Sequence, residues 1–264
     1  MTNRTRKPST RPHPNGAVPP ALPETDATRS VRGAAVTAGV ALLLMSALAG
    51  FAKFVALDGL VTPGNAAQTA TDIAQSDGLF RLGIVSMFLV IVLDVVVAWA
   101  LYRVFSPVSK SISMLAAAFR LVFAGVFLAA IGQLLGVLRV LGNDDYLSVF
   151  NADQLHAQAL LGVNAFNDLW VVALGLFGIH LLVIGYLAYR SGYVPRLLGV
   201  LLAIAGLGYT IDSFGIVLSQ GTWTAIASYT FIGEFLFALW LVIRGRRLTP
   251  SEPRLHENPV AAAR

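Results

Sequence analysis

The stretch RSGYVPRLLGVLLAIAGLGYTIDSF, residues 190–214, decides the fold. Gly192 tolerates a positive φ angle and Pro195 suits the start of a helix, so the first residues predict a tight turn between two arginines. An apolar run follows over residues 197–207, and the polar residues Tyr209, Asp212 and Ser213 come after it. This order predicts a basic turn that leads into a membrane-spanning helix with a polar far end.

The composition of the whole chain agrees with a membrane protein. Of the 264 residues, 56% are hydrophobic and only 12% are charged, whereas a soluble domain carries about a quarter charged residues. The net charge is +5, and the basic residues lie in short runs between apolar segments. We therefore expect them to face a membrane surface, and we expect no nucleic-acid partner. The absence of cysteine excludes disulfides and thiolate chemistry.

Six apolar segments are long enough to cross a bilayer, which takes about 20 residues per helix. They predict an all-α, six-helix transmembrane bundle over residues 33–245, between tails at 1–32 and 246–264 whose composition predicts disorder. A short surface helix is expected over residues 65–76, where alanine and isoleucine recur near helical spacing. The predicted spans are residues 33–55, 79–105, 112–138, 159–189, 195–218 and 223–243.

The distribution of basic residues predicts the orientation. Six spans place both termini on one side, and lysine and arginine concentrate on the cytoplasmic side of membrane proteins. The expected location is the cytoplasmic membrane of the cell, crossed several times, with both termini in the cytoplasm. The terminal side carries Arg4, Arg6, Lys7, Arg11, Arg29, Arg32, Arg103, Lys110, Arg190, Arg196, Arg244, Arg246 and Arg247. The other side carries Asp58, Asp72, Asp77, Asp144, Asp145 and Asp153.

Small residues recur three or four positions apart in two of the predicted spans. They are Gly199, Ala203 and Gly206 in the fifth span, and Gly132 and Gly136 in the third. Such spacing permits close contact between helices in lipid, so we interpret both sets as packing positions.

Several motifs resemble a known family. The chain is similar to a bacterial family of polytopic membrane proteins described as domain of unknown function 4386, over residues 33–244. The resemblance implies a six-span fold and brings no catalytic residues with it. The motifs are GLFRLGIVS (78–86) followed by Asp94, LAAAFRL (115–121), YLSVFNADQLHAQAL (146–160), FGIHLLVIGYLAYRSGYVPRLLGVLLAIAGLGYTIDSF (177–214), and Glu234 in the last span.

An inner polar layer is predicted from charged residues within the spans. These residues are Asp94, Arg120, His180 and Glu234. At 1.5 Å of rise per residue, all four lie about 12–16 Å from the cytoplasmic end. The second and third spans are joined by a short turn, so an Asp94–Arg120 ion pair is expected. The layer is interpreted as an ion-pair network that locks the bundle, or as a proton relay or ion pathway.

An outer polar cluster is predicted near the opposite membrane surface. Its members are Arg81, Gln133, Asn164, Asp168, Tyr209, Asp212 and Ser213. They lie at similar depth, which is consistent with a water-filled vestibule or with hydrogen bonds between helices near the interface. Asn164 and Asp168 are spaced i, i+4 and so share a helix face.

The sequence leaves the activity open between classes. No nucleotide-binding, zinc-protease or nucleophile-elbow motif is present. A metal site at Asp94, His180 and Glu234 has suitable ligand types but no supporting spacing, so we expect neither a metal nor a cofactor. The favoured function is small-solute or proton-linked transport, binding or sensing, with the lipid bilayer and a small-molecule ligand as partners. An intramembrane enzyme is the alternative, with His180 and Glu234, or Asp168 and Asp212, as the acid–base pair. A structural or accessory role is the third interpretation.

The predicted topology is tested by reporter fusions. We expect a fusion at Asp72 or Asp145 to report an external position and one at Arg247 to report the cytoplasm, because most basic residues fall on the side of Arg247 and only a few, such as Arg81 and Arg139, lie near the opposite span ends. The measurement is the activity of a reporter that works on only one side of the membrane. An external signal at Arg247 would contradict the predicted topology.

Overall fold

The structure is a computed structural model, and it describes residues 26–142, 145–219, 223 and 226–248. The described chain contains helices and turns and no β-strand. Its longer helices are α1 (Asp26–Gly50), α2 (Ala66–Gln75), α3 (Asp77–Phe105), α4 (Lys110–Val140), α5 (Ala152–Arg190), α6 (Arg196–Leu218) and α8 (Ile232–Arg244). The shorter elements are η1 (Phe51–Leu57), η2 (Asp58–Leu60), η3 (Asp145–Val149), α7 (Ala227–Thr230) and η4 (Gly245–Arg247).

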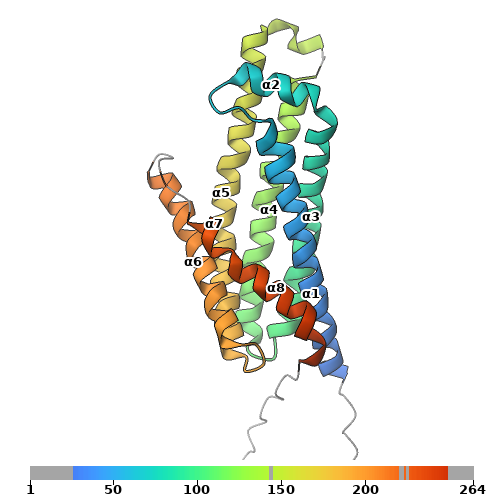
Figure 1. Ribbon diagram of the computed structural model, residues 1–264, viewed down its shortest axis with the longest axis vertical. Helices are drawn as coiled ribbons and strands as arrows, with labels where there is room; N and C mark the ends of the chain where they lie inside the picture. Colours follow the sequence, from blue (N-terminus) through green and yellow to red (C-terminus); the bar gives the residue numbers. More distant parts are fainter. Residues whose placement is uncertain (1–25, 143–144, 220–222, 224–225, 249–264) are drawn as a thin grey trace, which may run out of the picture.

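Six helices form a closed ring around the core. Each of α3, α4, α5 and α6 packs against the helix before it in the ring, which begins with α1. Helix α8 closes the ring because it contacts both α6 and α1, and it crosses the bundle obliquely (Figure 1). The start of α1, the end of α8 and the turns between α3 and α4 and between α5 and α6 all lie at one end of the molecule (Figure 1). The basic residues of these segments therefore gather at that end.

Among the described residues, five helices are long and apolar enough to cross a membrane: residues 29–60, α3, α4, α5 and α6. Large apolar side chains such as Phe54, Leu115 and Phe214 are at least half exposed on their outer faces. Contiguous apolar surface of this kind marks contact with lipid rather than water. The all-helical class predicted from the sequence is thus confirmed, and the apolar helices are consistent with the predicted lipid bilayer.

The sixth predicted span, residues 223–243, differs from the other five. It contains α7 and the 13-residue α8, and a helix of that length rises only about 20 Å, less than the roughly 30 Å hydrocarbon core. Asp212 of α6 accepts hydrogen bonds from the backbone N–H groups of Ile226 and Ala227. These bonds hold the start of α7 against α6, and the chain crosses the bundle obliquely from there.

The predicted tails fall mainly outside the described residues. Residues 1–25 and 249–264 are not described, whereas α1 begins at Asp26, before the predicted boundary at residue 33. At the other end, η4 continues beyond residue 245, and Leu248 is buried. The carbonyl of Leu248 accepts a hydrogen bond of 2.7 Å from Arg32 Nε. The two ends of the described chain are therefore joined to each other.

Helix α5 and the short helix α2 extend the bundle at the end opposite the basic residues. The 39 residues of α5 span about 58 Å, nearly twice the hydrocarbon thickness. Helix α2 packs beside α5 there (Figure 1). Its N-cap is Asn65, whose side chain accepts from Gln68 N–H at 3.0 Å. The short helix predicted at residues 65–76 is confirmed.

The turn between α5 and α6 is fixed by three groups. Gly192 has φ = 74°, a value that favours glycine. Ser191 Oγ accepts a hydrogen bond from Val194 N–H at 3.0 Å. The Tyr193 hydroxyl donates to the carbonyl of Val104 on α3 at 2.6 Å, and burial raises the pKa of this phenol above its usual range. The turn is thereby tied to the neighbouring helix.

Beyond this turn, glycines let α5 and α6 approach backbone to backbone. A Cβ on Gly206 would lie 2.6 Å from the carbonyl oxygen of Gly178, and one on Gly199 would lie 2.8 Å from that of Gly185. The packing role predicted for Gly199 and Gly206 is therefore confirmed. The GxxxG pair in α4 differs, because a Cβ on Gly132 or Gly136 meets no atom of the described chain within 4 Å. Within the described residues, that pair makes no close contact with another helix.

This contrast provides a matched test of close packing. We expect Gly206→Ala to destabilise the protein by about 1–3 kcal/mol, because the added methyl overpacks the α5–α6 contact. Gly132→Ala is the control, and we expect no loss, since alanine favours the helix and meets nothing. The measurement is the thermal unfolding midpoint of the detergent-solubilised protein. Equal midpoints for the two variants would contradict the packing role of Gly206.

Candidate functional site

The centre of the bundle contains a buried ion pair between α3 and α4. Arg120 Nη2 lies 2.7 Å from Asp94 Oδ1, and both side chains are almost fully buried, at 1% and 0% exposure. The two helices are antiparallel neighbours joined by the short turn at residues 106–109, so residues at equal distance from that turn meet. The charges are paired because an isolated charge in a nonpolar interior is strongly unfavourable.

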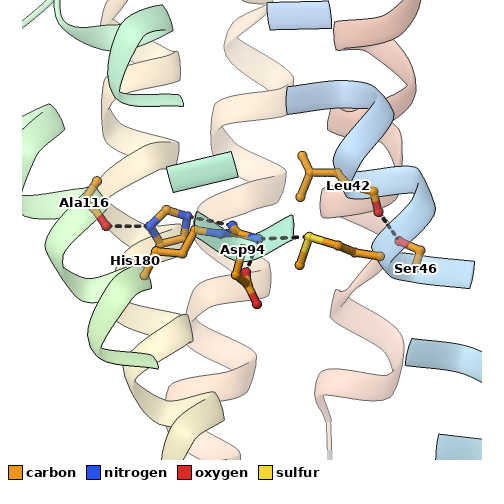
Figure 2. Close-up of polar contacts among 7 residues, drawn as sticks. Leu42, Ser46, Asp94, Ala116 and His180 are labelled. Carbon is orange, nitrogen blue, oxygen red and sulfur yellow. Dashed lines mark hydrogen bonds and ion pairs between the residues drawn. The ribbon is translucent and has the colours of Figure 1, made fainter. Parts of the chain in front are cut away.

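His180 of α5 extends this pair into a chain of polar contacts (Figure 2). Its Nδ1 lies 2.8 Å from the carbonyl oxygen of Ala116, and its Nε2 lies 3.1 Å from Arg120 Nη1. A carbonyl and a guanidinium have fixed roles as acceptor and donor. Nδ1 therefore carries the proton and Nε2 accepts from Arg120. The imidazole is neutral, and both of its nitrogens are engaged.

Two further contacts surround the guanidinium of Arg120. Its Nη2 lies 3.8 Å from the sulfur of Met45 on α1, and its carbon lies 5.3 Å from the centre of the Phe177 ring. The ring also stacks near His180, with centroids 5.8 Å apart. Arg120 thus joins α1, α3, α4 and α5 through one side chain.

Glu234 of α8 lies on the other side of a small cavity beside this chain. The cavity is about 10 Å³, close to the space of one water molecule. Glu234, Arg120 and His180 line it, together with Leu42, Leu101, Leu181, Ile184, Leu202 and Phe237. Glu234 Oε1 is buried and has no hydrogen-bond partner among the described residues. Its carboxyl interacts with the phenol of Tyr209 on α6.

The structure therefore brings together the four residues of the predicted inner layer, and Tyr209 joins them. Tyr209 was assigned to the outer cluster because it follows the apolar run of α6. Its ring packs edge-on against Phe177, with centroids 5.6 Å apart. Depth along α6 does not reveal this contact, which depends on the direction in which the side chain points.

The rest of the predicted outer cluster is not a single site. Gln133, Asn164 and Asp168 are exposed on the outer faces of α4 and α5. Arg81 is also exposed, and its Nε is paired with Asp77 Oδ2 at 2.7 Å, one turn earlier on the same helix. Ser213 packs against Gly175 on α5. A Cβ placed on Gly175 would lie 2.5 Å from the hydroxyl oxygen of Ser213. Residues at matching depth thus point in different directions.

Asp212 is buried and holds the chain that follows α6. Its Oδ1 accepts from Trp223 Nε1 and from Ile226 N–H, each at 2.9 Å, and its Oδ2 accepts from Ala227 N–H at 2.7 Å. Three donors satisfy this carboxylate, so it acts as the cap of α7. The predicted acid–base pair of Asp168 and Asp212 is disfavoured, since Asp168 is exposed and Asp212 is fully engaged.

One polar contact near the outer end escaped the sequence analysis. Lys53 lies in the π-helical segment η1 and forms an ion pair with Asp58. Its Nζ also donates to Asn167 Oδ1 at 3.3 Å. Asn167, rather than Asn164 or Asp168, is therefore the residue of this turn that faces a neighbouring helix. The signal available in the sequence was the lysine itself, which lies within an apolar run and precedes an aspartate by five residues.

Metal ligands do not cluster within the described chain. No group of three or more histidine, aspartate or glutamate side chains is arranged to hold an ion there. His180 also has no free nitrogen for a metal, because its two nitrogens contact Ala116 and Arg120.

A double-mutant cycle tests the ion pair. We expect Asp94→Asn alone to destabilise the protein by about 3–5 kcal/mol, because Arg120 is left buried without its counterion. We expect Asp94→Asn combined with Arg120→Gln to recover much of that loss. Unfolding of the purified protein in detergent measures the coupling between the two positions. If the single losses simply add, the two residues are not energetically coupled.

Comparison with known proteins places the chain in a family. The profile described as Domain of unknown function (DUF4386) matches residues 37–245. An uncharacterized protein of Archaeoglobus fulgidus is 41% identical over 166 residues, which cover 63% of this chain and 85% of the relative. This relative is archaeal, so it does not confirm the bacterial origin expected from the resemblance. No solved structure matches the chain. The chain belongs to the DUF4386 family of domains of unknown function, as its motifs indicated.

Proposed function

We propose that the chain is a proton-linked protein of the cytoplasmic membrane, in which Glu234 binds and releases the proton. The observation that carries the proposal is the buried Oε1 of Glu234, which has no hydrogen-bond partner among the described residues and belongs to a residue lining a cavity with Arg120 and His180. An ionisable residue within the membrane region is a strong candidate for a functional group. The basic end of the bundle faces the cytoplasm in this proposal.

Charge balance supports a proton at Glu234. Within the described inner layer, Asp94 and Glu234 are the two carboxyl groups and Arg120 is the one fixed cation, since His180 is neutral by its hydrogen bonds. The layer is neutral when Glu234 is protonated and carries one negative charge when Glu234 is ionised. A net charge in a low-dielectric interior is unfavourable, so the site favours uptake of one positive charge.

The size of the cavity favours a proton over a larger cation or solute. A hard metal cation needs a shell of several oxygen ligands, and among the side chains lining the cavity only Glu234 supplies oxygen. A volume of about 10 Å³ holds no solute larger than water. Proton binding or sensing therefore fits the site better than passage of a small molecule through it.

The enzyme interpretation has less support from the geometry. An acid–base pair of His180 and Glu234 requires a nitrogen that exchanges its proton with a substrate. Both nitrogens of His180 are used by Ala116 and Arg120, and the cavity has no room for a substrate. The Asp94–Arg120–His180 chain instead acts as a fixed support beside an exchangeable carboxyl group.

Infrared difference spectroscopy tests the assignment. As the pH falls, we expect the wild-type protein in detergent to gain a carbonyl band of a protonated buried carboxyl group, and Glu234→Gln to lack it. Asp168→Asn is the control, since Asp168 is exposed, and we expect it to keep the band. The Asp94→Asn variant shows whether the second buried carboxyl group contributes to the band. A band that persists in Glu234→Gln and disappears in Asp94→Asn would reassign the proton to Asp94.

A further inference from the structure

Three chain segments that are distant in sequence meet at the basic end of the bundle. The start of α1 packs against η4. A Cβ placed on Gly245 of η4 would lie 3.1 Å from the Cβ of Ala35 on α1. Arg103, in the last turn of α3, donates a hydrogen bond to Ser30 Oγ on α1. Figure 1 shows the start of α1 and the end of α8 side by side at this end. We call the arginines of these segments the arginine corner: Arg29, Arg103, Arg244, Arg246 and Arg247.

The arginine corner concentrates positive charge that no carboxylate of the described residues pairs with. All five side chains are exposed, and none forms an ion pair with another described residue. The other arginines at this end are arranged differently. Arg190 lies 5.9 Å from the ring centre of Tyr186, and Arg196 lies 5.6 Å from that of Tyr189. Those two cations rest on aromatic faces, whereas the corner has no such partner within the described chain.

We propose that the arginine corner binds the phosphate headgroup of an anionic lipid. The planar guanidinium forms paired hydrogen bonds that match the geometry of phosphate oxygens. Clusters of four or more arginines or lysines next to the membrane attract anionic lipids in this way. Five such groups stand on three converging segments, so they form a surface rather than a single contact.

The apolar surface beside the corner identifies the source of the phosphate as a lipid. Ile243 directly precedes Arg244 on α8 and is 61% exposed, and Leu239 is exposed one turn earlier on the same helix. A headgroup on the arginines therefore has an apolar strip next to it on which its acyl chain can lie. A soluble phosphate compound would gain nothing from that strip.

The binding site also lies at the end of the helix that carries Glu234. The 13 residues of α8 run from the inner layer to Arg244, and η4 follows immediately with Arg246 and Arg247. A lipid at the corner thus contacts the segment that fixes one end of α8. The lipid site nevertheless rests on its own residues and does not depend on the proton assignment.

Native mass spectrometry of the full-length protein in a neutral detergent tests the lipid site. The probes are phosphatidylglycerol and phosphatidylcholine, which share acyl chains and differ in net charge. We expect the wild type to retain phosphatidylglycerol in preference, and Arg244→Gln/Arg246→Gln/Arg247→Gln to bind it at least about tenfold more weakly, because each arginine near the surface contributes to attraction of anionic lipid. Replacing the same three arginines with lysine should give an intermediate loss, since charge is kept and the planar fork is removed.

The control removes the same number of charges from the same end of the bundle. Lys110→Gln/Arg190→Gln/Arg196→Gln should bind phosphatidylglycerol within about twofold of the wild type, because it leaves the corner intact. An equal loss in this control would overturn the proposal in favour of diffuse attraction. Equal retention of the two lipids by the wild type would overturn it as well. Displacement of the lipid by millimolar glycerol phosphate would show a site for soluble phosphate compounds instead. Thermal unfolding of each variant establishes that it is folded.

Discussion

The arrangement of the bundle depends on the neutralisation of one buried guanidinium. Arg120 lies within α4, a helix that is long and apolar enough to cross a membrane. An arginine at the centre of a membrane-spanning helix costs about 2.5–3.5 kcal/mol on insertion scales. Asp94, His180 and Met45 each provide a contact to it from a different helix. A pair that is this well buried contributes specificity more than net stability, because desolvation offsets much of the Coulomb attraction. Other pairings of the same apolar helices would leave the charge without these partners, so we infer that the ion pair favours this register.

Helix α8 provides none of these contacts to Arg120 and is held in the bundle by other interactions. It is attached at both ends: Asp212 holds the chain before it, and the contact of Arg32 with Leu248 holds the chain after it. Between these points α8 packs closely on α1, where a Cβ on Gly39 would lie 2.8 Å from the backbone nitrogen of Val242. The carboxyl group of Glu234 is thus presented to the inner layer by a separate element, while Asp94 is locked by Arg120. This separation is the physical reason that the two buried carboxyl groups have different roles in our proposal.

The sequence predicted the inner layer better than the outer cluster, and the reason is geometric. Residue spacing along a helix gives depth, and a short turn gives neighbours, so the meeting of Asp94 and Arg120 followed from two local facts. Depth alone does not give the direction of a side chain around the helix axis, and for this reason Asn164 and Asp168 were grouped with Asp212 although they are exposed on the outer face of α5. The Arg81–Asp77 pair, by contrast, was accessible from its i, i+4 spacing. The role of Asp212 was not accessible, because its partners include backbone N–H groups beyond the following loop. The neutral state of His180 likewise required the positions of Ala116 and Arg120.

The stretch that predicted the membrane fold also determines the geometry of the site. Gly178 of α5 and Gly206 of α6 lie at a contact where neither can carry a side chain. Each glycine has an aromatic residue nearby in the sequence that contacts the inner layer. Phe177 directly precedes Gly178, and Tyr209 follows Gly206 by about one turn. Because the backbones touch at the glycines, Tyr209 reaches both Phe177 and the carboxyl group of Glu234. A wider spacing between α5 and α6 would draw the phenol away from Phe177 and Glu234. The small residues in the stretch 190–214 therefore do more than permit packing. They set the distance between α5 and α6, and that distance determines whether Tyr209 reaches Glu234.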